Sequence, residues 1–174
     1  MKKLTKTLLI AYLIAAAAGV LIHFLYQWFP NPVLALVSPV RESIWEHVKL
    51  IYFPLLAVSL VMGRGGNGTG RAPWLLSMVF ACVVMLGVGY LYHIVFRGEA
   101  MAVDLLLFFG ALALGFLLPR TLWPLCEWPG MEKAAWALAA LLGVLIVWFT
   151  FFPLNTALFA DLSGAVRTFW TIPV

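Results

Sequence analysis

The sequence predicts an all-α integral membrane protein, built as a bundle of about five transmembrane helices. Hydrophobic residues make up 64% of the 174 residues and charged residues only 10%, whereas soluble domains carry about 25% charged residues. The mean hydropathy is +1.04. The few charges separate long uncharged runs, and about 20 apolar residues in a helix cross a bilayer. A water-soluble globular fold is therefore excluded.

The transmembrane segments follow from the positions of the charges. Lys, Arg, Asp and Glu are absent from five runs, 7–40, 50–63, 72–96, 105–119 and 134–160. These runs are rich in Leu and Ala and lack the alternation of barrel strands, so each predicts a helix. We expect one transmembrane domain over 1–174, with spans near 5–29, 40–62, 73–96, 101–118 and 133–152 and a C-terminal tail over 153–174.

Local signals justify each element in order. The first apolar run exceeds the 7–15 residues typical of a secretory signal, so we expect an uncleaved first span. Ser38 is expected to cap the second helix, with Pro39 as its first residue and a kink at Pro54. The second and fourth helices must then carry charged residues in their first turns. Pro- and Gly-rich segments mark the breaks, at 30–32, 63–73, 97–99 and 119–130.

Lys and Arg residues indicate the orientation of the bundle. With the N-terminus inside, seven of them lie at cytoplasmic ends (Lys2, Lys3, Lys6, Arg64, Arg71, Arg120, Lys133) and four lie outside (Arg41, Lys49, Arg97, Arg167). This bias favours an N-in, C-out topology in the plasma membrane. The basic residues are scattered in ones and twos, which favours topology over nucleic-acid binding as the reason for the net charge of +4.

The histidines and most acidic residues gather at the predicted outer ends of the spans. His23, His47 and His93 belong to spans one, two and three, and five of the seven acids lie on the same side (Glu42, Glu46, Glu99, Asp104, Asp161). Ionisable residues at membrane depth are costly, and they usually face a cavity or a partner. The pattern therefore predicts a polar functional site at this end of the bundle.

The segment from Ser38 to Lys49 is the densest part of this predicted site. On one helix, Glu42, Glu46 and Lys49 would share a face, with Ser43 and His47 on a neighbouring stripe. Three histidines suit zinc or another divalent metal, with carboxylates as ligands or as a general base. The candidate metal ligands are His23, His47, His93 and Asp104, and the candidate catalytic residues are Glu46, Glu42 and Ser43. A haem held by two histidines is less favoured.

A simpler interpretation stays open beside this one. The charges from Arg41 to Lys49 would then form a solvated helix start with intrahelical pairs, and the histidines would bond to backbone carbonyls. Three functions follow from these alternatives. The first is a binder or carrier of a metal ion or small polar solute; the second is a metal-dependent hydrolase acting on a lipid, amide or ester. The third is an accessory membrane subunit, which can form oligomers through small-residue helix faces.

Two resemblances support these expectations. The strings His23-Phe24-x-Tyr26-x-Trp28 and Ser38-Pro39-x-x-Glu42-Ser43-x-Trp45-Glu46-His47-x-Lys49 resemble an uncharacterised family of small bacterial multi-pass membrane proteins, a domain of unknown function. That resemblance marks one set of residues, namely His23, Glu42, Glu46, His47, Asp104 and Asp161. Ser43-x-x-x-His47 is also similar to the membrane zinc amidases of the alkaline ceramidase and adiponectin-receptor kind, in which three histidines hold zinc beside a Ser and an Asp.

Overall fold

All regular elements in the described part of the chain are helices. A computed structural model describes residues 2–63 and 70–163, so residues 164–174 of the predicted outer tail lie outside it. The elements are α1 (Lys2–Trp28), α2 (Pro32–Ala35), α3 (Ile44–His47), α4 (Lys49–Met62), α5 (Ala72–Tyr90), the π-helix η1 (Leu91–Val95), α6 (Met101–Leu117), α7 (Pro119–Cys126), α8 (Met131–Phe151) and the 3₁₀ helix η2 (Ala157–Phe159). The predicted all-α class is confirmed.

Four helical stretches are long and apolar enough to cross a membrane: Thr5–Trp28, Ile44–Met62, Ala72–Val95 and Met131–Phe151. A fifth arises if α6 and α7 count as one span, although they meet at an angle of 42°. Pro119 begins α7, and its ring removes the backbone donor that would continue the ladder of α6. The uncharged runs predict five spans, and the described chain has four candidate spans, or five if the bent pair is counted as one span.

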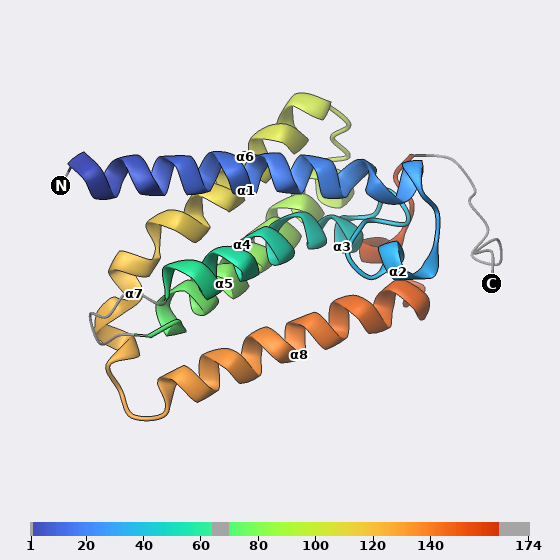
Figure 1. Cartoon of the computed structure of the whole chain (residues 1–174). Coiled ribbons are helices and arrows are strands. Elements are labelled where there is room, and N and C mark those ends of the chain that lie inside the picture. Colours follow the sequence, from blue (N-terminus) through green and yellow to red (C-terminus); the bar gives the residue numbers. More distant parts are fainter. Residues whose placement is uncertain (1, 64–69, 164–174) are drawn as a thin grey trace.

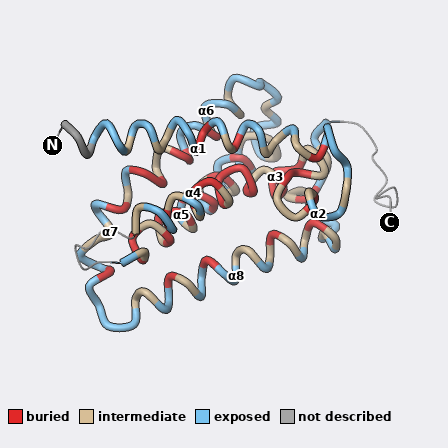
Figure 2. Tube along the Cα trace, viewed as in Figure 1, coloured by how far each residue is buried: buried red, intermediate tan, exposed pale blue. Residues whose placement is uncertain are grey.

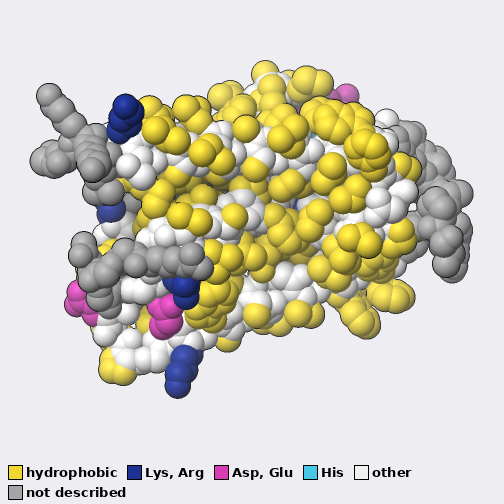
Figure 3. Space-filling model, in the orientation of Figure 1, with side chains coloured by type: hydrophobic (Ala, Val, Ile, Leu, Met, Phe, Trp, Pro, Cys, Tyr) yellow, Lys and Arg dark blue, Asp and Glu magenta, His cyan; other side chains and the backbone are white. Residues whose placement is uncertain are grey.

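The helices run back and forth along one axis, with α3 and α4 in the middle (Figure 1). Of the most apolar window of each span, 67% is buried in Ile44–Met62 but only 17% in Thr5–Trp28 and 22% in Met131–Phe151. Figure 2 shows this burial along α3 and α4, while α1 and α8 are exposed over much of their surface. The space-filling view shows that the exposed flank is covered by hydrophobic side chains, with Lys and Arg at the end that holds the N-terminus (Figure 3).

The opposite end of the bundle holds α2, α3, the loop between them and the described part of the C-terminal tail (Figure 1). The side chain of Asn31 caps α2 by accepting from Val33 N–H and Leu34 N–H. The chain then crosses the bundle end irregularly until Ser43, whose hydroxyl accepts from Glu46 N–H and caps α3. Between α2 and α3, the bundle end that is predicted to be polar is therefore an irregular loop over 36–43.

The predicted start of the second helix at Ser38 and Pro39 is wrong. The Ser38 hydroxyl instead donates to Ile22 C=O at 2.6 Å and accepts from Tyr26 N–H at 2.9 Å. These two groups would bond directly in a regular helix, so the hydroxyl enters the ladder of α1. Glu42 consequently precedes the helix, and it does not share a helical face with Glu46 as the spacing suggested.

Candidate metal centre

Two of the predicted ligands, His23 and His47, meet the predicted catalytic residue Glu42 at this end of the bundle. His23 lies near the end of α1, Glu42 lies on the loop before α3, and His47 is the last residue of α3. One potential ligand atom from each residue lies within 4.8 Å of the others. In a tetrahedral zinc site with ligand bonds of 2.0–2.2 Å, neighbouring ligand atoms are about 3.4 Å apart. The group therefore fits a metal ion after side-chain shifts of about 1 Å.

The His47 ring is oriented by the cap of its own helix. Its Nδ1 lies 2.7 Å from the backbone oxygen of Ser43, and because a carbonyl only accepts, Nδ1 carries a proton. Nε2 then faces Glu42 Oε2 at 3.2 Å. This contact between a nitrogen and a carboxylate needs either a second ring proton or a cation. A backbone carbonyl behind the ring is also the usual outer partner of a metal-binding histidine.

His23 completes the group from α1. Its Nε2 lies 4.0 Å from Glu42 Oε1, and its ring centroid lies 5.4 Å from that of His47. Its Nδ1 is buried and has no hydrogen-bond partner within the described part of the chain. A buried unpaired nitrogen is costly and commonly marks the place of an ion or water. The same carboxylate oxygen, Glu42 Oε1, also accepts from Gln27 Nε2 at 3.3 Å, so α1 contacts Glu42 twice.

His93 and Asp104, the other two predicted ligands, form a separate pair. His93 Nε2 lies 2.8 Å from Asp104 Oδ1, and His93 Nδ1 lies 2.9 Å from Gly98 C=O. His93 belongs to the π-helix η1, and Arg97 after it adopts a φ of 53°. π-Helical turns and left-handed backbone at non-glycine residues are both energetically unfavourable and are frequent at functional sites.

The helix register brings this pair to the level of the metal centre. Gly19 of α1 packs so closely on Phe108 of α6 that an added Cβ would lie 2.7 Å from the Phe108 ring. The two helices run in opposite directions (Figure 1). His23 lies four residues after Gly19, and Asp104 lies four residues before Phe108. Because the helices are antiparallel, His23 and Asp104 lie at the same level along the bundle axis.

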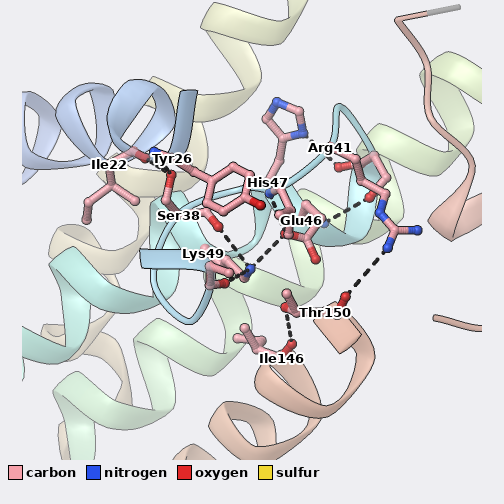
Figure 4. A network of polar contacts seen from close by, with 12 residues as sticks. Ile22, Tyr26, Ser38, Arg41, Glu46, His47, Lys49, Ile146 and Thr150 are labelled. Atoms are coloured by element: carbon pink, nitrogen blue, oxygen red, sulfur yellow. Dashed lines mark hydrogen bonds and ion pairs between the residues drawn. The ribbon is translucent and has the colours of Figure 1, made fainter. Parts of the chain in front are cut away.

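A buried ion pair lies on the other side of α3. Lys49 Nζ is 2.7 Å from Glu46 Oε2, and the side chains are 0% and 2% exposed. The ammonium also donates to Ala35 C=O at 2.8 Å and to Ser38 C=O at 3.1 Å, while Glu46 Oε2 accepts from Val40 N–H. Figure 4 shows this network, with the His47 ring pointing away from it. The sequence predicted an ion pair between Glu46 and Lys49, and this pair exists. The simpler interpretation expected these charges to be solvated, which is wrong because both side chains are buried.

These contacts determine what the predicted catalytic residues do. The Ser43 hydroxyl caps α3, and its carbonyl orients His47. The Glu46 carboxylate accepts a hydrogen bond from the Lys49 ammonium. Of the three predicted catalytic residues, only Glu42 belongs to the group that can hold a metal.

The described part of the C-terminal tail packs on the loop that carries Glu42. Leu162 N–H donates to Glu42 C=O at 2.8 Å, and Phe159 packs its ring against Trp45 and Phe149. Asp161, which the sequence placed in the same set, accepts from Ser163 through its side chain. Glu42 is thus fixed by its backbone to the tail and by its side chain to α1.

The sequence matches a family of unknown function, DUF6512, over residues 1–166. The chain belongs to the DUF6512 family. No curated protein and no solved structure matches it. The match spans the candidate metal centre, the His93–Asp104 pair and the Lys49 network, so all of them lie within the DUF6512 region. The predicted membership of an uncharacterised family is confirmed.

Sequence reasoning about this DUF6512 chain missed the roles of Ser38, Gln27 and Lys49. Lys49 did carry a signal, because it has Glu46 three residues before it and is followed by the uncharged run 50–63. A lysine that enters an apolar span beside an acid is expected to be buried and paired. Ser38 and Gln27 carried no such signal, because their partners are distant in the sequence. Ser38 contacts Ile22 of α1, 16 residues before it, and Gln27 contacts Glu42 of the loop, 15 residues after it.

Proposed function

We propose that this membrane protein binds a divalent transition-metal ion, with zinc as the expected ion, as a binder or carrier. The observation that carries the proposal is the convergence of His23, Glu42 and His47, whose ligand atoms lie within 4.8 Å of one another. The three side chains are 23%, 34% and 26% exposed, so an ion can enter from the bundle end. Two imidazoles and one carboxylate favour zinc, iron or copper over calcium and magnesium, which prefer oxygen ligands.

The number of ligands favours exchange of the ion over a structural role. Structural zinc sites use four protein ligands, whereas sites with three keep a position open for water or another ligand. Glu42 lies on a loop, while the two histidines lie on helices. A site with one ligand on a loop and one open position is suited to taking up and releasing an ion.

A second candidate is a metal-dependent hydrolase, because the open position would hold an activated water. The engagement of Glu46 with Lys49 argues against Glu46 as the general base. In this candidate the general base is Asp104, because Asp104 lies at the level of the candidate metal centre and its carboxylate is oriented by His93. His93 and Asp104 then act beside the metal, not as its primary ligands.

Elemental analysis of the purified chain tests the metal site. We expect one zinc ion per chain after dialysis against micromolar zinc, and at least a tenfold loss of bound zinc in His47→Ala and Glu42→Gln. His93→Ala is the matched control, because this histidine of the same bundle end lies outside the group of three. Zinc binding that persists in both ligand variants would contradict the proposed centre.

We further propose the N-in, C-out orientation in the plasma membrane that the Lys and Arg bias indicates. Single cysteines at Glu99 and Asn67 test it with a membrane-impermeant thiol reagent applied to intact cells. Labelling is expected at Glu99→Cys and not at Asn67→Cys. The parent chain is the control, since Cys82 and Cys126 are buried. The reverse pattern would indicate the opposite orientation.

A further inference from the structure

One hollow lies along the C-terminal half of α8, and a second lies just beyond the end of this helix. The first is an apolar groove of about 530 Å³ between α4 and α8, lined by Tyr52, Phe53 and Leu56 on one side and by α8 residues from Ala140 to Phe151, with Phe152 after them, on the other. The second is a hollow of about 470 Å³ lined by Arg41 and by tail residues from Pro153 to Ala160. Phe152 lines the groove, and the next residue, Pro153, lines the second hollow.

The apolar groove has the dimensions of one lipid leaflet. The α8 residues that line it extend from Ala140 to Phe151, which corresponds to about 16.5 Å of helix at 1.5 Å per residue. Half of the ~30 Å hydrocarbon core is about 15 Å. The polar atom at the groove wall, the Tyr52 hydroxyl, donates to Ala139 C=O at 3.0 Å. The groove therefore offers apolar surface along the depth that an acyl chain occupies.

Arg41 lies where the groove reaches the end of the bundle. Its Nη2 is 3.5 Å from Thr150 C=O in the last turn of α8, which places the guanidinium beside the groove exit. Burial lowers the pKa of Arg41 while Glu46 and Asp161 raise it, and an arginine stays charged in any case. The guanidinium carries five donors in a planar fork that matches phosphate oxygens in pairs. The two acids nearby limit the hollow to a ligand of low negative charge.

We propose that the groove and the Arg41 hollow together bind one glycerophospholipid, with an acyl chain between α4 and α8 and the phosphodiester at Arg41. Three observations support this occupant: the apolar groove runs about one leaflet deep, a hollow lined by Arg41 begins at the next residue of the chain, and the junction lies at the end of a candidate membrane-spanning helix. The lipid site is separate from the metal centre, because neither hollow is lined by His23, Glu42 or His47.

Native mass spectrometry of the full chain in detergent tests the proposal, with phosphatidylglycerol added at defined concentrations. We expect a complex of one lipid per chain in the parent protein. Val144→Trp fills the groove from an exposed position, and Arg41→Gln removes the phosphate partner. Each variant is expected to lower the lipid-bound fraction at least fivefold.

Matched controls separate this site from general lipid contact. Leu141→Trp places the same ring at an exposed residue of α8 that does not line the groove, and Arg97→Gln removes an arginine from the same bundle end. Both controls should retain the lipid. Equal loss in controls and test variants, or an undiminished complex in Val144→Trp, would overturn the proposal. Displacement of the lipid by millimolar inorganic phosphate would also overturn it, because the hollow would then bind a free anion. Val144 is exposed, so this variant tests the proposal even if Arg41→Gln fails to fold.

Discussion

Replacing Lys49 with methionine is expected to lower the free energy of unfolding by about 3–5 kcal/mol, the usual cost of removing one partner from a buried ion pair. The substitution keeps the length of the side chain but leaves the Glu46 carboxylate, which is 2% exposed, without its cation. It also removes the donor for Ala35 C=O and Ser38 C=O. Reversible unfolding in mixed detergent micelles measures the difference.

A double variant separates the loss of the pair from the loss of packing. In Lys49→Met with Glu46→Gln no charge is buried, and the glutamine carbonyl can still accept from Val40 N–H. More than half of the lost stability should return. Lys133→Met is the matched control, because this lysine is exposed at the other end of the bundle, and it should change little. A double variant as unstable as Lys49→Met would contradict a pair-based explanation.

Zinc is expected to stabilise the folded chain by about 2.7 kcal/mol when its free concentration is 100 times its dissociation constant, because the ion binds the folded state. Three ligands from α1, the loop and α3 converge only in that state. Removal of the ion with a chelator should reverse the gain. The same unfolding assay, with and without zinc, gives the measurement.

The zinc effect should disappear in Glu42→Gln, because the amide is a poor replacement for the carboxylate ligand. Glu99→Gln changes an exposed acid at the same bundle end and should keep the full effect. Stabilisation of equal size in the parent chain and in Glu42→Gln would show that zinc acts elsewhere on the protein.

The helical fold was predictable because a bilayer imposes a simple rule on composition. Every long uncharged run in the described chain contains a long helix, and Pro119 explains the bend at the end of the fourth run. The start of the second helix was not predictable, because Ser38 and Ser43 are both good caps by residue type. What decides between them is the contact of Ser38 with Ile22 and Tyr26 on α1, which local sequence does not encode.

The candidate site was predictable as a set of residues but not as a set of contacts. Side-of-membrane sorting correctly gathered His23, Glu42 and His47 at one bundle end. Helical spacing predicted that Glu42 and Glu46 share one face of a helix. In the structure Glu42 lies on a loop and contacts His47, whereas Glu46 lies on α3 and contacts Lys49. The pairing of His93 with Asp104 depends on how α6 packs against its neighbours, with close approaches at Gly89 of α5 and Gly19 of α1, and the local sequence does not encode these contacts.

The central position of α4 has a consequence for how the protein is made. Ile44–Met62 has the lowest mean hydropathy among the four spans, 1.5 against 2.2–2.4, and it carries both Glu46 and Lys49. Each unpaired charge adds up to about 3 kcal/mol to the cost of transferring a helix from the translocon into lipid. In the proposed membrane arrangement, this segment gains most from entering the bilayer together with its neighbours, after Ala35 and Ser38 have supplied carbonyl partners for Lys49. We therefore expect insertion of the core helix to be coupled to assembly of the bundle.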